Sequence, residues 1–397
     1  MTFDFDSEIS RTGTSSIKWE FVIEGQKAVF GDRSDRKHGD DRLLPMWVAD
    51  MDFQCPPAVT AALQARAAHG IFGYSAPTDR YYEAVQAWMA RRYGRPVERE
   101  WLVLTPGVVV ALYMLVQTFV APGEKVLVQR PVYYPFMSAI ESGGAEVVSN
   151  SLLYADGRYQ MDFADLAAKV ADPAVKMAIL CSPHNPVGRV WTAAELTRFR
   201  DICRAHDVLV VSDEIHCDLL FEGVPFTSYG LLDEQSIICT APSKTFNLAG
   251  LKTSNVIIPD GAQRARFAAT LEHHGIHGAN PFGLAATEAA YTHGEPWLAT
   301  VMAYVGENYR FLAAYVAAHL PQLRVVAPEG TYLVWVDCRG LGLTPAGLKQ
   351  RFMEQARVYL NEGEMFGPEG EGFVRLNIAC PRSTLAEALE RIRAALG

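Results

Sequence analysis

Short runs of β-branched and other apolar residues alternate with helical patterns through the middle of this chain of 397 residues. These runs are almost continuously hydrophobic, which is typical of strands that are covered on both faces. Strands of this kind that alternate with helices predict an α/β fold, with a mostly parallel sheet flanked by helices. The six candidate strands are Lys125–Gln129, Glu146–Ser149, Met177–Cys181, Val208–Ser212, Ile237–Thr240 and Asn255–Ile258.

The pattern changes near residue 295, beyond which longer helical patterns take over around one apolar stretch at Thr331–Val336. The chain is also too long for one small core. We therefore expect a large domain over residues 51–295 and a smaller α+β domain over residues 296–397. The N-terminal segment 1–50 is expected to be part of the smaller domain. Within the large domain, Thr192 and Glu195 form a capping box, which predicts a helix that runs to about Ala205.

Composition excludes several classes of protein. The formal net charge of −9 is spread along the chain, and nucleic-acid binding needs clustered Lys and Arg. The most apolar stretch, Val108–Val116, is far shorter than the roughly 20 residues of a membrane span. The N-terminus has no apolar run of a secretory signal, and the seven cysteines form no CxxC pair. We expect a cytoplasmic protein without nucleic-acid or membrane partners.

Polar motifs follow several of the predicted strands, where parallel α/β sheets collect their ligands. Lys244 lies in Ser243-Lys-Thr-Phe-Asn247, directly after the strand that ends at Thr240. A lysine that is partly desolvated there favours the neutral amine, which can form a Schiff base with an aldehyde. Taken alone, this lysine is better explained as a solvated loop residue.

Asp213 and Asn185 follow two other strands. Asp213 ends an apolar run 31 residues before Lys244, where its carboxylate could pair with a protonated pyridine nitrogen. Capping a helix or pairing with an arginine is the alternative. Asn185 lies in Cys181-Ser-Pro-His-Asn185-Pro, which a turn alone would also explain, and its amide could donate to a phenolic oxygen.

Tyr133 and Arg375 are two further candidates. Tyr133, in Pro131-Val-Tyr-Tyr-Pro-Phe136, could stack on a flat heterocycle or simply pack in the core. Arg375, in Phe373-Val-Arg-Leu-Asn377, is suited to a bidentate grip on a carboxylate, and a structural ion pair is the alternative.

A phosphate site is indicated by Thr105-Pro-Gly107, a glycine turn before a predicted helix at Val109–Phe119. The free N–H groups of a helix start bind phosphate. Ser243 could add a hydroxyl group and Lys252 a positive charge.

Together these motifs resemble the fold-type I enzymes that depend on pyridoxal 5′-phosphate (PLP), the aspartate aminotransferase superfamily. The resemblance covers nearly the whole chain and keeps the family's order of Asn, Asp, Ser-Lys and Arg. Five segments are similar to the MalY/PatB branch of cystathionine β-lyases, also described as C–S lyases: Arg11–Trp19, Trp47–Phe53, Gly70–Tyr74, Asp213–His216 and Ser243–Asn247.

The resemblance implies a role for each motif. Lys244 would hold PLP and later move the Cα proton, Asp213 would pair with the pyridine nitrogen, and Tyr133 would stack on the ring. Arg375 would grip the substrate carboxylate. The other implied residues are Gly107, Val108, Val109, Ser243 and a neighbouring subunit's Tyr74 at the phosphate, Asn185 at the phenolic oxygen, and Ala49 and Tyr134 at the substrate.

Two positions depart from the general aminotransferase pattern. His216 stands where a Tyr usually helps to hold the phenolic oxygen, and Lys252 stands where an Arg usually binds the phosphate. A further cluster, Glu272-His-His-Gly-Ile-His277, does not match the HExxH pattern of metal-binding helices, so no metal is expected.

The resemblance implies a homodimeric β-lyase with active sites at the subunit interface and a small amino acid as substrate. It would cleave L-cystathionine or related cysteine S-conjugates to a thiol, pyruvate and ammonia. A class I/II aminotransferase is the alternative. A regulatory protein that only retains the fold is a third hypothesis, which the presence of both Lys244 and Asp213 disfavours.

Overall fold

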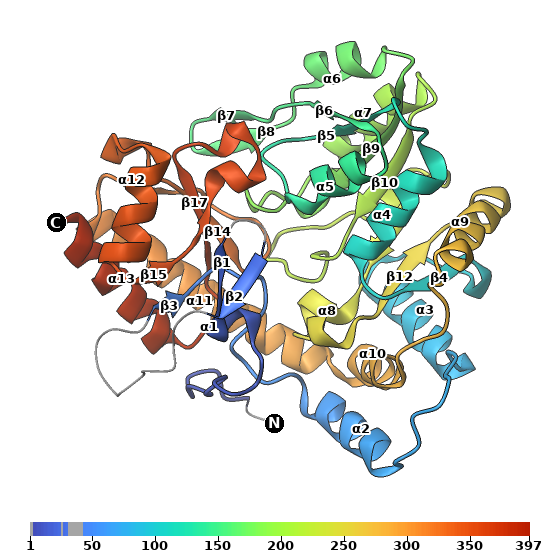
Figure 1. Ribbon diagram of the computed structural model, residues 1–397, viewed down its shortest axis with the longest axis horizontal. Coiled ribbons are helices and arrows are strands. Elements are labelled where there is room, and N and C mark those ends of the chain that lie inside the picture. Colours follow the sequence, from blue (N-terminus) through green and yellow to red (C-terminus); the bar gives the residue numbers. More distant parts are fainter. Residues whose placement is uncertain (1–2, 25–26, 31–42) are drawn as a thin grey trace.

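The computed structural model describes residues 3–24, 27–30 and 43–397 (Figure 1). Part of the predicted N-terminal segment 1–50 therefore lies outside the described residues. The large sheet has the strand order β4-β12-β11-β10-β9-β5-β6. Its strands are β4 (Leu102–Thr105), β5 (Lys125–Val128), β6 (Glu146–Ser149), β9 (Val175–Cys181), β10 (Leu209–Asp213), β11 (Ile237–Thr240) and β12 (Ser254–Ile257).

The prediction of a mostly parallel sheet is confirmed. Only β12 runs antiparallel to its neighbours, β11 and β4. All six predicted strands are present, with ends within two residues of the prediction. The edge strand β4 is absent from the prediction, although its sequence Leu-Val-Leu-Thr is mostly apolar and its first and last residues are buried.

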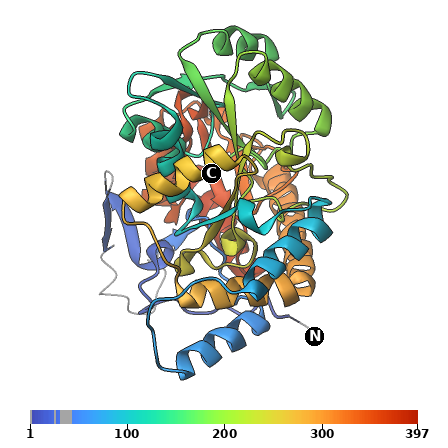
Figure 2. The ribbon, with the colours of Figure 1, turned by 90° about the vertical axis from the view of Figure 1, so that its right-hand side faces the viewer.

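Helices cover both faces of this sheet, which explains why its strands are apolar along their whole length (Figure 2). Val126 and Val128 of β5 pack in one core with α4 (Val108–Phe119), α5 (Pro135–Ser142) and α9 (Gly261–His273). Leu127 between them packs in the other core, with α3 (Asp79–Tyr93), α6 (Phe163–Val170) and α7 (Ala193–Arg204). The predicted capping box opens α7: Glu195 N–H donates to the Thr192 hydroxyl at 3.2 Å.

A second, antiparallel sheet lies in the C-terminal part of the chain, drawn in orange and red in Figure 1. Its order is β13 (Arg324–Val325), β14 (Leu333–Asp337), β17 (Phe373–Asn377) and β16 (Asn361–Glu362). The N-terminal β3 (Leu44–Pro45) pairs in parallel with β15 (Val358–Tyr359), so the segment that follows β3 starts beside this sheet. The domain boundaries stay a prediction.

Further α-helices, a π-helix and two pairs of short strands lie outside the two sheets. None of the described helices is long and apolar enough to span a membrane. The further helices are α1 (Ile17–Glu20), α2 (Pro57–Ala68), α8 (Pro242–Thr245), α10 (Pro281–His293), α11 (Glu295–His319), α12 (Pro345–Lys349), a π-helix (Gln350–Gln355) and α13 (Arg382–Leu396). The two antiparallel strand pairs are β1 (Phe21–Glu24) with β2 (Lys27–Phe30) and β7 (Leu153–Ala155) with β8 (Arg158–Gln160).

Candidate active site

The carboxyl ends of the parallel strands β9, β10 and β11 bring three predicted residues together. Asp213 is the last residue of β10 and pairs in register with Cys181 and Cys239 on its two neighbours. Asn185 follows β9, and Lys244 lies in the short helix α8 that follows β11. Parallel strands end at one edge, so residues that are distant in sequence converge there.

Asp213 is a buried carboxyl group, 4% exposed. Its Oδ1 accepts one hydrogen bond, from Ile215 N–H at 3.1 Å. Burial raises the pKa of Asp213 to about 7, although the positive charge of Lys244 opposes this shift. Among the described residues, no Lys, Arg or His forms an ion pair with Asp213. A cationic N–H from a ligand would supply the missing partner.

Lys244 is held by a hydrogen bond to a backbone oxygen. Its Nζ donates to the carbonyl of Ala49 at 2.7 Å. Burial lowers the pKa of Lys244 to about 8; Asp50 and Asp213 act in the opposite direction, and the charges of Arg375 and Lys252 add to the lowering. A lysine with this pKa is partly neutral near physiological pH, which its use as a nucleophile or base requires.

Arg375 is 3% exposed and lies in the middle of β17. Its guanidinium donates only to uncharged oxygens: Asn185 Oδ1 at 2.9 Å, Asn361 Oδ1 at 2.6 Å and the Trp47 carbonyl at 3.0 Å. Its Nε has no hydrogen-bond partner in the described part of the chain, and burial lowers the pKa of Arg375 to about 10. No carboxylate among the described residues pairs with it, so the structural ion pair is not what the structure shows. A ligand carboxylate would supply the counter-charge.

His216 lies near these charges. It is 3% exposed, and its Nδ1 has no hydrogen-bond partner among the described residues. Burial lowers its pKa well below the ordinary value, and the positive charges of Lys244 and Arg375 act in the same direction. His216 is therefore neutral in the physiological range. Its ring meets Tyr332 edge to face at 6.3 Å.

Two tyrosines lie next to the site. Burial raises the pKa of Tyr133, and the nearby charge of Arg375 lowers it. The Tyr133 ring lies 5.4 Å from that of Tyr134 and 6.0 Å from that of Phe136. Tyr134 is partly exposed, which leaves it accessible to a substrate.

The predicted phosphate site lies at the start of α4. Gly107 has φ +130°, which a residue with a side chain rarely adopts, and it places Val108 and Val109 in the first turn of the helix. The first N–H groups of a helix have no acceptor within it and are available to an anion. Gly107 N–H itself donates to the Ser254 hydroxyl at 3.1 Å. Ser254 was not among the predicted residues.

Two predicted residues stand apart from the buried groups. Tyr74 is fully exposed, and Lys252 lies at the C-terminal end of a short 3₁₀ turn. Both line a surface cavity of about 590 Å³ that also contains Thr105 and Pro106, just before α4. The charge of Lys252 nevertheless acts on Lys244. Ser243 adjoins Lys244 in α8 and is partly buried.

The structure adds residues to which the sequence reading gave no role. Asn361 accepts a hydrogen bond from Arg375, and Asn377 donates to the Val48 carbonyl, next to Ala49. Tyr332 donates to the Ala49 carbonyl at 3.0 Å. Asn377 is the last residue of the motif Phe373–Asn377 that contains Arg375. A lone Asn in the two-residue strand β16 carries no signal of its own. Among the described residues, no three His, Cys, Asp or Glu side chains are placed to hold a metal ion.

The buried groups fit PLP and an amino acid. Asp213 has no cationic partner within the described ranges, the N–H groups at the start of α4 suit a phosphate, and a partly neutral lysine lies at the same edge of the sheet. Arg375 adds an uncompensated positive charge for a carboxylate.

The buried state of Asp213 generates a prediction for the ligand-free chain. A carboxyl group whose pKa rises on folding binds more protons when folded between about pH 4 and pH 7. Its contribution to the free energy of unfolding therefore falls as pH rises through this window. Urea unfolding should show Asp213→Asn gaining on the wild type from pH 4 to pH 7, by on the order of 2–4 kcal/mol.

Asp337→Asn is the matched control. Burial raises the pKa of Asp337, but hydrogen bonds from Arg339 outweigh burial and leave that pKa below its ordinary value. This variant should therefore lose stability relative to the wild type as pH rises from acidic values. If the free energy of unfolding, relative to the wild type, changed with pH in the same way in both variants, the role assigned to burial of Asp213 would be contradicted.

Comparison with known proteins agrees with this geometry. Residues 44–392 match the family "Aminotransferase class I and II". The chain is 44% identical to cystathionine beta-lyase PatB of Bacillus subtilis, over 99% of this chain and 100% of that protein. Cystalysin of Treponema denticola, solved with PLP, is 34% identical with a TM-score of 0.93 and coverage of 100% and 99%. The PLP-bound C–S lyase of Staphylococcus hominis is 34% identical with a TM-score of 0.89 and coverage of 99% of each chain. The predicted fold-type I architecture and PLP cofactor are thus confirmed, and the chain belongs to the class I and II aminotransferase family.

Proposed function

We propose that this chain is a PLP-dependent carbon–sulfur β-lyase. It cleaves L-cystathionine or a related cysteine S-conjugate to a thiol, pyruvate and ammonia. The observation that carries the proposal is the 44% identity, over the full chain, to a protein named as a cystathionine β-lyase. The buried site supports it, because Lys244 and Arg375 suit the amine and the carboxylate chemistry of an α-amino acid.

The side chains divide the work of the reaction. When bound, PLP acts as a sink for the electron pair left at Cα. Arg375 holds the substrate carboxylate, because its guanidinium is buried and no described residue supplies it with an anion. Lys244 takes the Cα proton, and its pKa of about 8 keeps part of the population neutral. Asp213 keeps a proton on the ring nitrogen.

Asn185 links the carboxylate and cofactor parts of the site. Its Oδ1 accepts from Arg375 at 2.9 Å, which fixes the amide and leaves its NH₂ group to donate to the phenolic oxygen of PLP. Tyr133 would stack on the ring, and the first turn of α4 would bind the phosphate. Loss of the thiolate from Cβ would follow removal of the Cα proton by Lys244. No side chain in this set distinguishes elimination from amino transfer, so product analysis decides between them.

The first test supplies L-cystathionine without any keto acid and follows pyruvate and free thiol. We expect many turnovers per active site, because elimination returns PLP unchanged. A single turnover that resumes only when a keto acid is added would instead establish an aminotransferase. Lys244→Ala should abolish both reactions and serves as the blank.

A second prediction concerns Arg375. Replacement by Ala removes the only partner proposed for the substrate carboxylate, and a charge-assisted hydrogen bond is worth roughly 1.5–3 kcal/mol. The KM for L-cystathionine should therefore rise by about 10- to 150-fold. The Kd for PLP, measured by absorbance, should change far less than this KM, because Lys244, Asp213 and the first turn of α4 still hold the cofactor when Asn185 loses its contact with Arg375.

Arg204→Ala is the control, because Arg204 pairs with Asp233 at 2.7 Å outside the proposed site. It should leave both constants near the wild-type values. Loss of PLP from Arg375→Ala with an unchanged KM would contradict the assignment.

We also propose that the enzyme is a homodimer that shares its sites. Ile71, Phe72 and Tyr74 are exposed side by side, beside the cavity that reaches Thr105 and Pro106. Exposed apolar side chains grouped in this way are typical of an interface. In such a dimer, Tyr74 of each chain binds the phosphate of the partner.

Mixing two inactive variants tests this arrangement. Tyr74→Ala should weaken PLP binding, and Lys244→Ala should be inactive. After subunit exchange at PLP concentrations that do not saturate Tyr74→Ala, each hybrid dimer has one intact site, so about a quarter of the sites should work. If Tyr74 serves its own chain, or if the protein is monomeric by sedimentation, mixing will restore nothing.

A further inference from the structure

The backbone segment Met46–Phe53, hereafter the strap, runs between Lys244 and β17. Every carbonyl from Met46 to Met51 accepts a hydrogen bond. The donors come from separate parts of the chain: Asn377 N–H to Met46, Arg375 to Trp47, Asn377 to Val48 and Asp50, Lys244 and Tyr332 to Ala49, and Asn247 to Met51. The strap thus connects the amine of the proposed site to the arginine.

Ala49 is the point at which the strap contacts Lys244. Its carbonyl accepts from Lys244 Nζ at 2.7 Å and from the Tyr332 hydroxyl at 3.0 Å. A carbonyl oxygen has two lone pairs, so both donors can be satisfied at once. A neutral amine that donates one N–H to this oxygen must direct its lone pair elsewhere.

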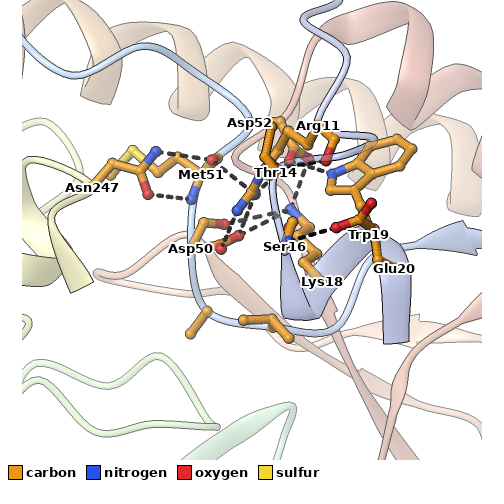
Figure 3. A network of polar contacts seen from close by, with 12 residues as sticks. Arg11, Thr14, Ser16, Lys18, Trp19, Glu20, Asp50, Met51, Asp52 and Asn247 are labelled. Atoms are coloured by element: carbon orange, nitrogen blue, oxygen red, sulfur yellow. Dashed lines mark hydrogen bonds and ion pairs between the residues drawn. The ribbon is translucent and has the colours of Figure 1, made fainter. Parts of the chain in front are cut away.

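An ionic cluster holds the next residues of the strap (Figure 3). Arg11 binds both carboxylate oxygens of Asp50, at 2.9 and 2.8 Å, and reaches Asp52 at 3.1 Å. Asp52 also accepts from Lys18 at 2.7 Å and from the Trp19 indole at 2.7 Å. The Lys18 side chain is 0% exposed. Two cations therefore balance two carboxylates in a partly dehydrated place.

Asn247 holds the opposite side of the strap, as Figure 3 shows. Its amide accepts from Met51 N–H at 2.9 Å and donates to the carbonyls of Met51 and Phe53, each at 2.9 Å. Asn247 follows Lys244 by three residues in the same turn of chain. The position of Ala49 is therefore set from the Lys244 side by Asn247 and from the N-terminal side by Arg11.

We propose that Arg11 and Asp50 are positioning residues for Lys244: their ion pair fixes the strap, and the balance of their charges sets how readily the amine carries a proton. The proposal rests on the β-lyase function for its role in catalysis. Burial matters here, because charges in a low-dielectric interior act over longer distances than they do in water.

The two residues should act on Lys244 in opposite directions. Asp50 raises the pKa of Lys244 and is the largest influence on it after burial. Without Arg11, the charge of Asp50 would be balanced only by the more distant Lys18, at 3.8 Å, and would raise that pKa further. Without the Asp50 charge, the pKa would fall. A purely structural role would loosen the strap in the same way in both variants.

The other groups that face Lys244 are the same in every variant. Asp213 raises its pKa, and Arg375 and Lys252 lower it. His216 is uncharged in the physiological range because burial lowers its pKa. Tyr332, which shares the Ala49 carbonyl, has a pKa raised by burial and also stays neutral. A shift between variants therefore reports on Arg11 and Asp50.

The experiment measures the pKa of Lys244 in the full-length, PLP-free chain. Trace acetic anhydride labels neutral amines, and mass spectrometry compares Lys244 with the exposed Lys176 from pH 6 to pH 10. We expect Asp50→Asn to lower the pKa of Lys244 and Arg11→Met to raise it, each by on the order of half to one pH unit. In the double variant, the pKa of Lys244 should lie close to the wild-type value. Arg11→Lys keeps the positive charge, so the pKa of Lys244 in that variant should also stay near that value.

In the holoenzyme, the acidic limb of the kcat profile should move in the same directions, while Arg204→Met leaves it in place. Shifts of the same sign in both single variants, or no shift in either, would overturn the proposal. Asp50→Asn keeps the test decisive if Arg11→Met does not fold, since an unchanged or raised pKa in that variant is sufficient to reject it. If the wild type releases no pyruvate, the proposed function is wrong. The labelling experiment does not depend on activity, so it still tests whether Arg11 and Asp50 set the pKa of Lys244.

Discussion

Burial of charge at one edge of the large sheet is the constraint on which the rest of the structure depends. Asp213 and Arg375 are buried and Lys244 is half-buried, and none of them forms an ion pair with an opposite charge among the described residues. Desolvation of a lone charge costs several kcal/mol, so the remaining fold must supply that free energy. The two cores packed on both faces of the sheet are where it is gained.

The same constraint explains the use of neutral hydrogen-bond partners around the site. Arg375 is held by two Asn side chains and a carbonyl, which fix its position without cancelling its charge. Lys244 is held by a carbonyl for the same reason. The carboxylates of Asp50 and Asp52, unlike that of Asp213, are ion-paired, with Arg11 and Lys18. The charges of Arg375 and Lys244 therefore remain free to pair with a ligand, while those of Asp50 and Asp52 are neutralised within the protein.

The sequence predicted the large sheet because its strands are apolar on both faces, a signal that survives without any tertiary information. It also indicated Lys244, Asp213 and Asn185, since residues that follow parallel strands converge whatever the loop details are. It did not indicate Asn361 or Ser254. Their roles depend on the pairing of β16 with β17 and of β12 with β4, and no local pattern encodes such pairing. The exposure of Tyr74 is likewise a property of the folded surface.

The antiparallel strand β12 has a consequence for the order in which the molecule is assembled. It lies between β4 and β11, and its first residue, Ser254, binds Gly107 at the mouth of α4 across 147 positions of sequence. Contacts this distant form slowly, because a long loop must close before they yield any stability. A ribosome that has released only the first half of the chain can therefore have made α4, but not the anchored turn in front of it. Competence to capture a phosphorylated ligand arrives late in synthesis, when most of the chain is already available to enclose it.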